Sequence, residues 1–91
     1  MAPPLVEITL PATNVTVAFG ATVHFTGTAS DAFDGNVTES LRWSSDRDGA
    51  IGRGGAFSRS SLSLGAHTIT ATVTDSHGLT DSATVKLNVS N

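Results

Sequence analysis

The sequence predicts an all-β fold, an antiparallel sandwich of about seven short strands in two layers. Apolar and polar residues alternate with a period of two along most of the 91-residue chain. Clusters of Gly, Asp and Asn interrupt this alternation about every 8–12 residues, as the turns of a small sandwich do. Apolar residues do not recur at helical spacing, so we expect essentially no helix.

The clearest pair of strands covers residues 65–89, where two alternating segments flank a turn. The expected inward residues are His67, Ile69, Ala71 and Val73 in the first segment and Ala83, Val85, Leu87 and Val89 in the second. The turn Asp75-Ser76-His77-Gly78 contains an Asp that can bond its own backbone and a Gly that tolerates positive φ. These features predict a hairpin.

The strands of the N-terminal half follow from the same alternation. The expected inward residues are Val6, Ile8 and Leu10 in a first edge strand, and Val23, Phe25, Gly27 and Ala29 in a long strand over residues 21–30. Pro11 is expected to end the first part of the edge strand, and Val15 and Val17 to continue the same edge. Gly27 and Ala29 are small, which indicates that another group packs close to this backbone.

The central residues complete the predicted core. Leu41, Trp43 and Ser45 share one face, and Trp43, the only Trp, is expected to be the central packing residue. Residues 46–49 predict a turn, and the glycine-rich residues 52–55 a loose or bulged stretch. Further expected core residues are Phe57, Leu62 and Leu64.

The composition indicates one small domain, which we assign to residues 5–90. Residues 1–4 are expected to be a linker that opens a fragment of a longer protein, with Met1 added in front. The chain contains no cysteine, so neither disulfides nor thiolate metal sites contribute. Because the net charge is −3 and no basic cluster or long apolar segment is present, we expect neither nucleic-acid binding nor membrane insertion.

Several motifs resemble those of bacterial immunoglobulin-like modules related to polycystic-kidney-disease (PKD) domains. They are Asp31-x-x-Asp34-Gly35, Leu41-x-Trp43-Ser44-Ser45, Asp48-Gly49-x-Ile51-Gly52-x-Gly54 and Leu62-x-Leu64-Gly65-x-His67-Thr68-Ile69-Thr70-Ala71-Thr72-Val73-Thr74-Asp75-x-x-Gly78. The resemblance extends over residues 3–89, although Trp43-Ser44-Ser45-Asp46 differs from the Trp-Asp-Phe-Gly-Asp-Gly of typical PKD domains. It implies an immunoglobulin-like Greek-key sandwich of the kind repeated in secreted hydrolases and cell-surface proteins.

Acidic loops are the candidate metal sites. Asp31, Asp34 and Asp75 are expected at one end of the sandwich, with Asp81 nearby, where their oxygens could bind calcium. Asp46 and Asp48 are expected at the opposite end, as a separate and poorer site. The alternative is that these aspartates cap turns through their own backbone without any metal.

The three histidines do not share the spacing or face that a zinc site requires. His24 is expected to point outward, and His77 lies in a turn. His67 is expected to be buried near Leu62, with a ring nitrogen bonded to the backbone as in the corner tyrosine of immunoglobulin-like folds.

The predicted function is non-catalytic. Neighbours in the turn Asp75-Ser76-His77 cannot aim at one another as a catalytic triad. We expect an extracellular spacer or adhesive unit whose partners are the neighbouring domains of the same polypeptide. The alternative is an accessory module that binds a polysaccharide or protein fibre for a secreted hydrolase, but Phe33 is the only aromatic residue expected to be exposed in a loop. Asn14, Asn36 and Asn88 begin glycosylation sequons.

Overall fold

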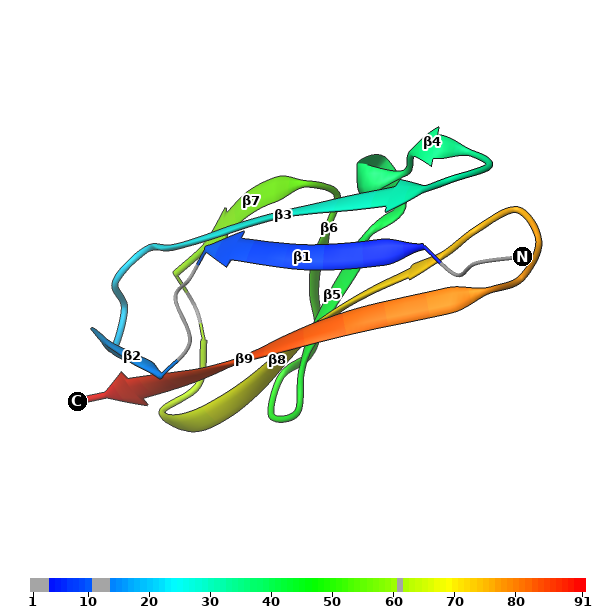
Figure 1. Ribbon diagram of the computed structural model, residues 1–91. Coiled ribbons are helices and arrows are strands. Elements are labelled where there is room, and N and C mark those ends of the chain that lie inside the picture. The colour runs from blue at the N-terminus through cyan, green and yellow to red at the C-terminus, as the bar shows by residue number, and fades with distance from the viewer. Residues whose placement is uncertain (1–3, 11–13, 61) are drawn as a thin grey trace.

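The computed structural model describes residues 4–10, 14–60 and 62–91, and these residues form an all-β fold of two sheets (Figure 1). One sheet contains β1 (Leu5–Leu10), β3 (Val23–Asp31), β4 (Gly35–Asn36) and β7 (Ala56–Arg59). The other contains β2 (Val15–Ala18), β9 (Thr80–Ser90), β8 (Gly65–Thr74), β5 (Arg42–Ser45) and β6 (Gly49–Arg53), in that spatial order. The helical content of the described residues is one 3-10 turn, η1 (Thr38–Ser40), so the predicted all-β class is confirmed.

The predicted hairpin is formed by β8 and β9, which pair antiparallel along their whole length. Its inward pairs include Ile69 opposite Val85 and Ala71 opposite Ala83. The Asp75 side chain closes the turn, because its Oδ1 accepts hydrogen bonds from the backbone N–H groups of His77 (2.9 Å) and Leu79 (2.8 Å). The hairpin and its turn chemistry are therefore as predicted.

Three aromatic rings join the two sheets at the centre of the core. Trp43 from β5 lies edge-on to Phe25 of β3 and to Phe57 of β7, with ring centroids 5.8 and 5.4 Å away. Its indole N–H donates to the Gly54 carbonyl at 2.8 Å. A Cβ at position 27 would lie 3.0 Å from the Trp43 ring, so Gly27 gives that ring room. Trp43 is the central packing residue that the sequence predicts.

The first edge strand differs from the prediction. β1 pairs with β3, but β2 pairs parallel with β9 in the opposite sheet, so Val15 and Val17 do not continue the same edge. The pairing register of β1 shifts between Ile8 and Leu10, which leaves Leu10 48 % exposed rather than inward. Pro11 lies outside the described residues.

Leu64 is a second departure, because 45 % of its surface is exposed whereas Leu62 is buried as predicted. The chain bends at Leu64 instead of continuing as a strand, and β8 begins immediately afterwards at Gly65, with φ 112°. The bend interrupts the alternation that would have turned both leucines inward.

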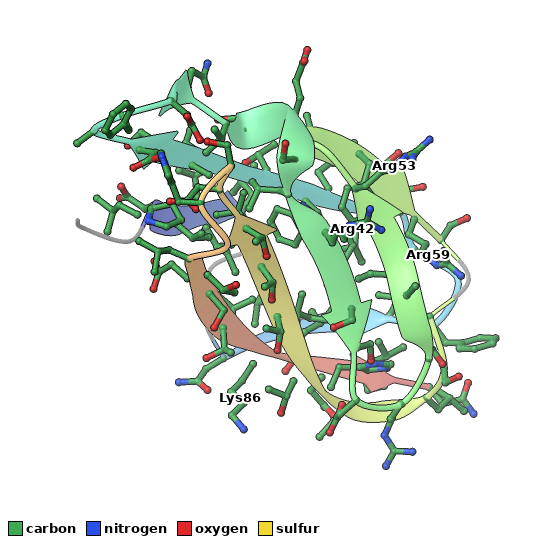
Figure 2. The ribbon with its side chains drawn as sticks, turned by 90° about the vertical axis from the view of Figure 1, so that its right-hand side faces the viewer. Arg42, Arg53, Arg59 and Lys86 are labelled. Atoms are coloured by element: carbon green, nitrogen blue, oxygen red, sulfur yellow. The ribbon has the colours of Figure 1, made fainter. Side chains whose placement is uncertain are left out.

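The outward face of the five-stranded sheet is covered by hydroxyl and guanidinium groups (Figure 2). From Thr68 to Thr74, alternate residues of β8 are threonines, which lie opposite to its inward row. Arg42 of β5 lies directly opposite Arg53 of β6, and Thr72 of β8 flanks Arg42 on its other side. This face therefore combines neutral polar groups with a small cluster of positive charge.

The fold is elongated, with extents of 45 × 19 × 18 Å. β1 begins at one end of the long axis and β9 ends at the other (Figure 1). Among the described residues there is no helix of the length and apolar character needed to cross a bilayer.

Candidate functional site

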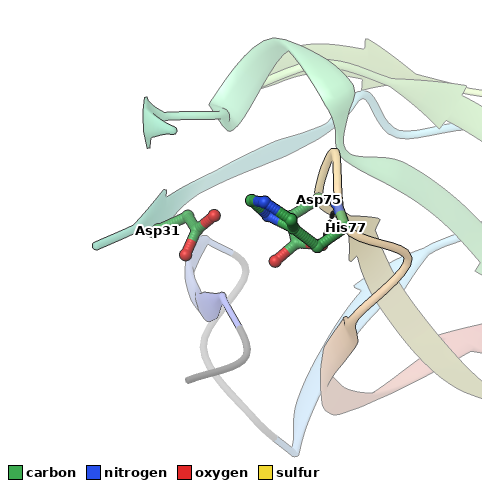
Figure 3. Close-up of side chains that lie close together, drawn as sticks. All are labelled: Asp31, Asp75 and His77. Atoms are coloured by element: carbon green, nitrogen blue, oxygen red, sulfur yellow. Dashed lines mark hydrogen bonds between the residues drawn. The ribbon is translucent and has the colours of Figure 1, made fainter. Parts of the chain in front are cut away.

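Two aspartates and a histidine come together at the end of the fold where β1 begins (Figures 1 and 3). Asp31 is the last residue of β3, Asp75 follows the end of β8, and His77 lies in the turn before β9. One ligand atom from each side chain lies within 4.8 Å of the other two. The residues of the site therefore come from both sheets, since β3 belongs to one sheet and β8 to the other.

The strand period explains why the two carboxylates meet. Asp31 continues the inward row of β3 after Phe25, Gly27 and Ala29. Asp75 is the next inward position after Val73 in β8. Each inward row therefore ends in a carboxylate where the core closes, and the two rows face each other from opposite sheets.

Both carboxylates are buried and incompletely bonded. Asp31 is 6 % exposed and Asp75 is 7 % exposed. The Oδ2 atom of each has no hydrogen-bond partner among the described residues, although Oδ1 of Asp75 closes the turn. A buried carboxylate oxygen without a partner destabilises the folded state. A ligand that contacts both oxygens would offset this cost.

His77 is exposed and packs against an aromatic ring, because its imidazole centroid lies 4.9 Å from that of Phe33. Phe33 is exposed as predicted, but Phe19 is exposed as well, at 56 %. The spacing between the three histidines predicts no metal site, so His77 was not expected to lie beside two aspartates. The signal that identifies it is the Asp75-x-His77 spacing within one turn.

Asp34 lies at the same end, but both its oxygens are engaged. Oδ2 accepts from the Ser76 backbone N–H at 3.0 Å, and Oδ1 accepts from the Ser76 hydroxyl at 2.9 Å. These bonds, chiefly the backbone one, hold the pKa of Asp34 below its ordinary value. Asp34 therefore links the loop after β3 to the β8–β9 turn.

The remaining aspartates bond to backbone N–H groups. Oδ2 of Asp81 accepts from Val6 at 2.9 Å, and Oδ1 of Asp46 accepts from Thr68 at 2.8 Å. Asp48 accepts from the backbone N–H and the hydroxyl of Ser63, and this bonding lowers the pKa of Asp48. Among the described residues, Asp46 and Asp48 bond to Thr68 and Ser63, which are distant in the sequence, whereas the capping alternative expected bonds to the backbone of their own turn.

His67 has the structural role predicted for it. It is 1 % exposed, its Nε2 lies 2.7 Å from the Ser63 carbonyl oxygen, and its Nδ1 lies 2.6 Å from the Ser45 hydroxyl. A carbonyl can only accept, so Nε2 is the donor, and in the neutral ring Nδ1 accepts from the Ser45 hydroxyl. His24 is exposed on β3, as expected.

The turn Asp75-Ser76-His77 is not arranged as a catalytic triad. The Ser76 hydroxyl donates to Asp34, and the Asp75 carboxylate accepts from the backbone of His77 rather than from its ring. A nucleophilic relay needs a serine hydroxyl bonded to an imidazole that a carboxylate orients.

A second polar surface lies over β5 and β6, where two adjoining grooves of about 410 and 480 Å³ share Arg42, Arg53 and Thr72. Arg59 lines the larger groove and donates from Nη1 to the Ile51 carbonyl at 2.9 Å, while its buried Nε has no partner among the described residues. The proximity of Arg42 and Arg53 depends on strand pairing across the sheet, so the sequence alone does not predict it.

The end of the fold with Asp31, Asp75 and His77 can hold a cation, and the grooves near Arg42 and Arg53 can hold an anionic group. The predicted calcium set of Asp31, Asp34 and Asp75 lies together at one end and stays a prediction. Comparisons with protein-family models, with curated proteins and with solved structures give no match for this chain.

Proposed function

We propose that this chain is a non-catalytic immunoglobulin-like module, related to PKD domains, that acts as a spacer in a secreted or cell-surface protein. The observation that supports the proposal most directly is the path of the chain, which enters at one end of the long axis and leaves at the other (Figure 1). Modules with this geometry pass the chain onward and separate the domains on either side of them.

The order of the strands supports the immunoglobulin-like part of the proposal. In that fold the third, sixth and seventh strands form one sheet, and the third carries a buried Trp. Here β5, β8 and β9 are neighbours in one sheet, and β5 carries the buried Trp43. His67, near the start of β8, bonds back to the Ser63 carbonyl in the manner of a corner tyrosine.

The spacer function is tested by joining two copies of the chain directly, end to end. The tandem protein should be extended in small-angle X-ray scattering, with a maximum dimension of about 90 Å, twice the length of one module. It should also fail to bind chitin, cellulose and collagen in pull-down assays. The single module measured under the same conditions is the control. A tandem protein folded side by side, or one retained on a polymer, contradicts the spacer proposal.

A second candidate function is that of an accessory polysaccharide-binding module, and the arginine grooves favour an anionic polymer. Arg42 and Arg53 lie directly opposite each other on neighbouring strands, where like charges repel and a bound carboxylate or sulfate would relieve the repulsion (Figure 2). Phe19 and Phe33 are the large exposed aromatics of the described residues and are far apart in the chain, so they offer no obvious flat platform for a neutral sugar.

Binding to alginate and heparin columns distinguishes the two functions. The accessory-module function predicts retention that falls with added salt, and elution at lower salt after R42A and R53A together. R47A is the matched control, because Arg47 donates to the Ala66 carbonyl and does not line these grooves. Flow-through of the unmodified chain at low salt would exclude this function.

A further inference from the structure

We propose that Asp31, Asp75 and His77 form a binding site for one divalent transition-metal ion of the zinc class. The ion would connect the end of β3 to the end of β8 and so hold the two sheets together at this end. The inference does not depend on the spacer function, because it follows from local geometry alone.

The unpartnered oxygens are the first part of the argument. Asp31 and Asp75 are each more than nine-tenths buried, and each keeps an Oδ2 without a hydrogen-bond partner among the described residues. One carboxylate oxygen of each lies within 4.8 Å of the other and of a ring nitrogen of His77, at the place drawn in Figure 3. Two like charges so placed repel each other and lack the hydration that an exposed pair would have. A bound cation would offset both the repulsion between the carboxylates and their missing hydration. A hydrogen bond to only one of the two oxygens would leave the other without a partner.

The second part is how firmly the ligands are held. Oδ1 of Asp75 accepts two backbone hydrogen bonds within the turn, which orient the side chain, while Oδ2 has no partner among the described residues. The same turn carries His77, and Asp34 fastens it to the loop after β3 through Ser76. The site therefore rests on two segments, the end of β3 with its loop and the β8–β9 turn, that hydrogen bonds connect before any metal binds.

The identity of the ligands selects the class of metal. Calcium takes 6–8 oxygen ligands, whereas this site supplies two carboxylates and an imidazole. Imidazole and carboxylate together suit zinc, which commonly takes three protein ligands and one water. Zinc ligands at about 2.1 Å lie roughly 3.4 Å from one another. Atoms that now lie within 4.8 Å of one another would therefore have to approach by up to about 1.4 Å. His77 is exposed, so its side chain has room to make this movement.

Titration of the metal-free 91-residue chain with zinc tests the site. Isothermal calorimetry should give one zinc ion per chain, and the melting temperature should rise with zinc and fall back on chelation. Calcium at the same concentration should leave the melting temperature unchanged. An equal or larger shift with calcium would overturn the zinc assignment in favour of a site for hard cations, and no zinc binding would overturn the site altogether.

Single substitutions locate the bound ion. D31N, D75N and H77A should each weaken zinc binding at least tenfold, because each removes one of three protein ligands. Asn is nearly the same size as Asp and keeps an amide oxygen, so D75N retains an acceptor for the turn. H24A is the matched control, since His24 is an exposed histidine outside the cluster, and it should bind zinc as the unmodified chain does.

Melting each metal-free variant separates loss of binding from loss of folding. If D31N and H77A remain folded and still bind zinc with unchanged affinity, the ion lies elsewhere and the proposal is wrong.

Discussion

The two ends of this fold use the same kinds of side chain in opposite ways. The closed end, defined by Ser45, Asp48, Ser63 and His67, has a buried histidine whose two ring nitrogens both have partners. The open end, defined by Asp31, Asp75 and His77, has buried carboxylates that each keep one oxygen without a partner among the described residues.

The contrast shows how to separate structural from functional polar groups in a small sandwich. At the closed end, polar atoms satisfy the backbone where strands begin and end, and this bonding holds the fold together. At the open end, burial has a cost that the described residues do not offset, which is the pattern expected where a ligand completes the structure. Residue type alone does not distinguish the two ends, but the hydrogen bonding does.

The largest expected effect comes from the closed end. H67A should lower the free energy of unfolding by about 3 kcal/mol, because it leaves a cavity and removes partners from Ser45 and Ser63. Urea denaturation measures the loss, which should be the same with and without added zinc or calcium. H24A, on the exposed face of β3, should leave stability unchanged. An unchanged unfolding midpoint for H67A would remove the contrast between the ends.

At the open end, a substitution is expected to raise the free energy of unfolding rather than lower it. In the metal-free chain at neutral pH, D31N should raise the free energy of unfolding by about 1 kcal/mol, because it removes one of two buried carboxylates that each keep an oxygen without a partner among the described residues. Urea denaturation in the presence of a chelator measures the change. D81N is the control and should lower stability, since Oδ2 of Asp81 accepts from the Val6 backbone. A loss of stability in D31N would show that Asp31 has a structural partner.

The smallest expected effect is a pH dependence of stability to which both ends contribute. Ser76 lowers the pKa of Asp34 at the open end, and Ser63 lowers that of Asp48 at the closed end, both from 3.8. A carboxylate whose pKa is lowered by folding stabilises the fold when the pH is above its pKa in the unfolded chain. This contribution is lost as the pH falls through its pKa in the folded chain. Stability should therefore decline as the pH falls below 3.8.

Unfolding midpoints measured between pH 5 and pH 2 test this dependence. S76A and S63A should each make the decline shallower by a small amount, because Asp34 is exposed and Asp48 is only half-buried, so solvent screens both interactions. Identical pH profiles for the unmodified chain and both variants would show that these bonds do not persist in solution.

Predictions from the sequence succeeded where the two-residue period is unbroken. Trp43, Phe25 and His67 are buried as predicted, and the β8–β9 hairpin forms in the expected place. They failed where the period is interrupted, at the register shift before Leu10 and the bend at Leu64. Half of the open end was also predictable, because Asp31 and Asp75 continue inward rows, whereas the hydrogen bonds between Asp34 and Ser76 join segments distant in the sequence.

The sequence by itself determined which face of each long strand is buried, because alternation along a strand is a local property of the backbone. Only the tertiary structure decided that β2 joins the sheet opposite to β1, that Arg42 meets Arg53, and that two inward rows end in facing carboxylates beside His77. These outcomes depend on pairing between residues far apart in the chain, and no local pattern specifies such partners.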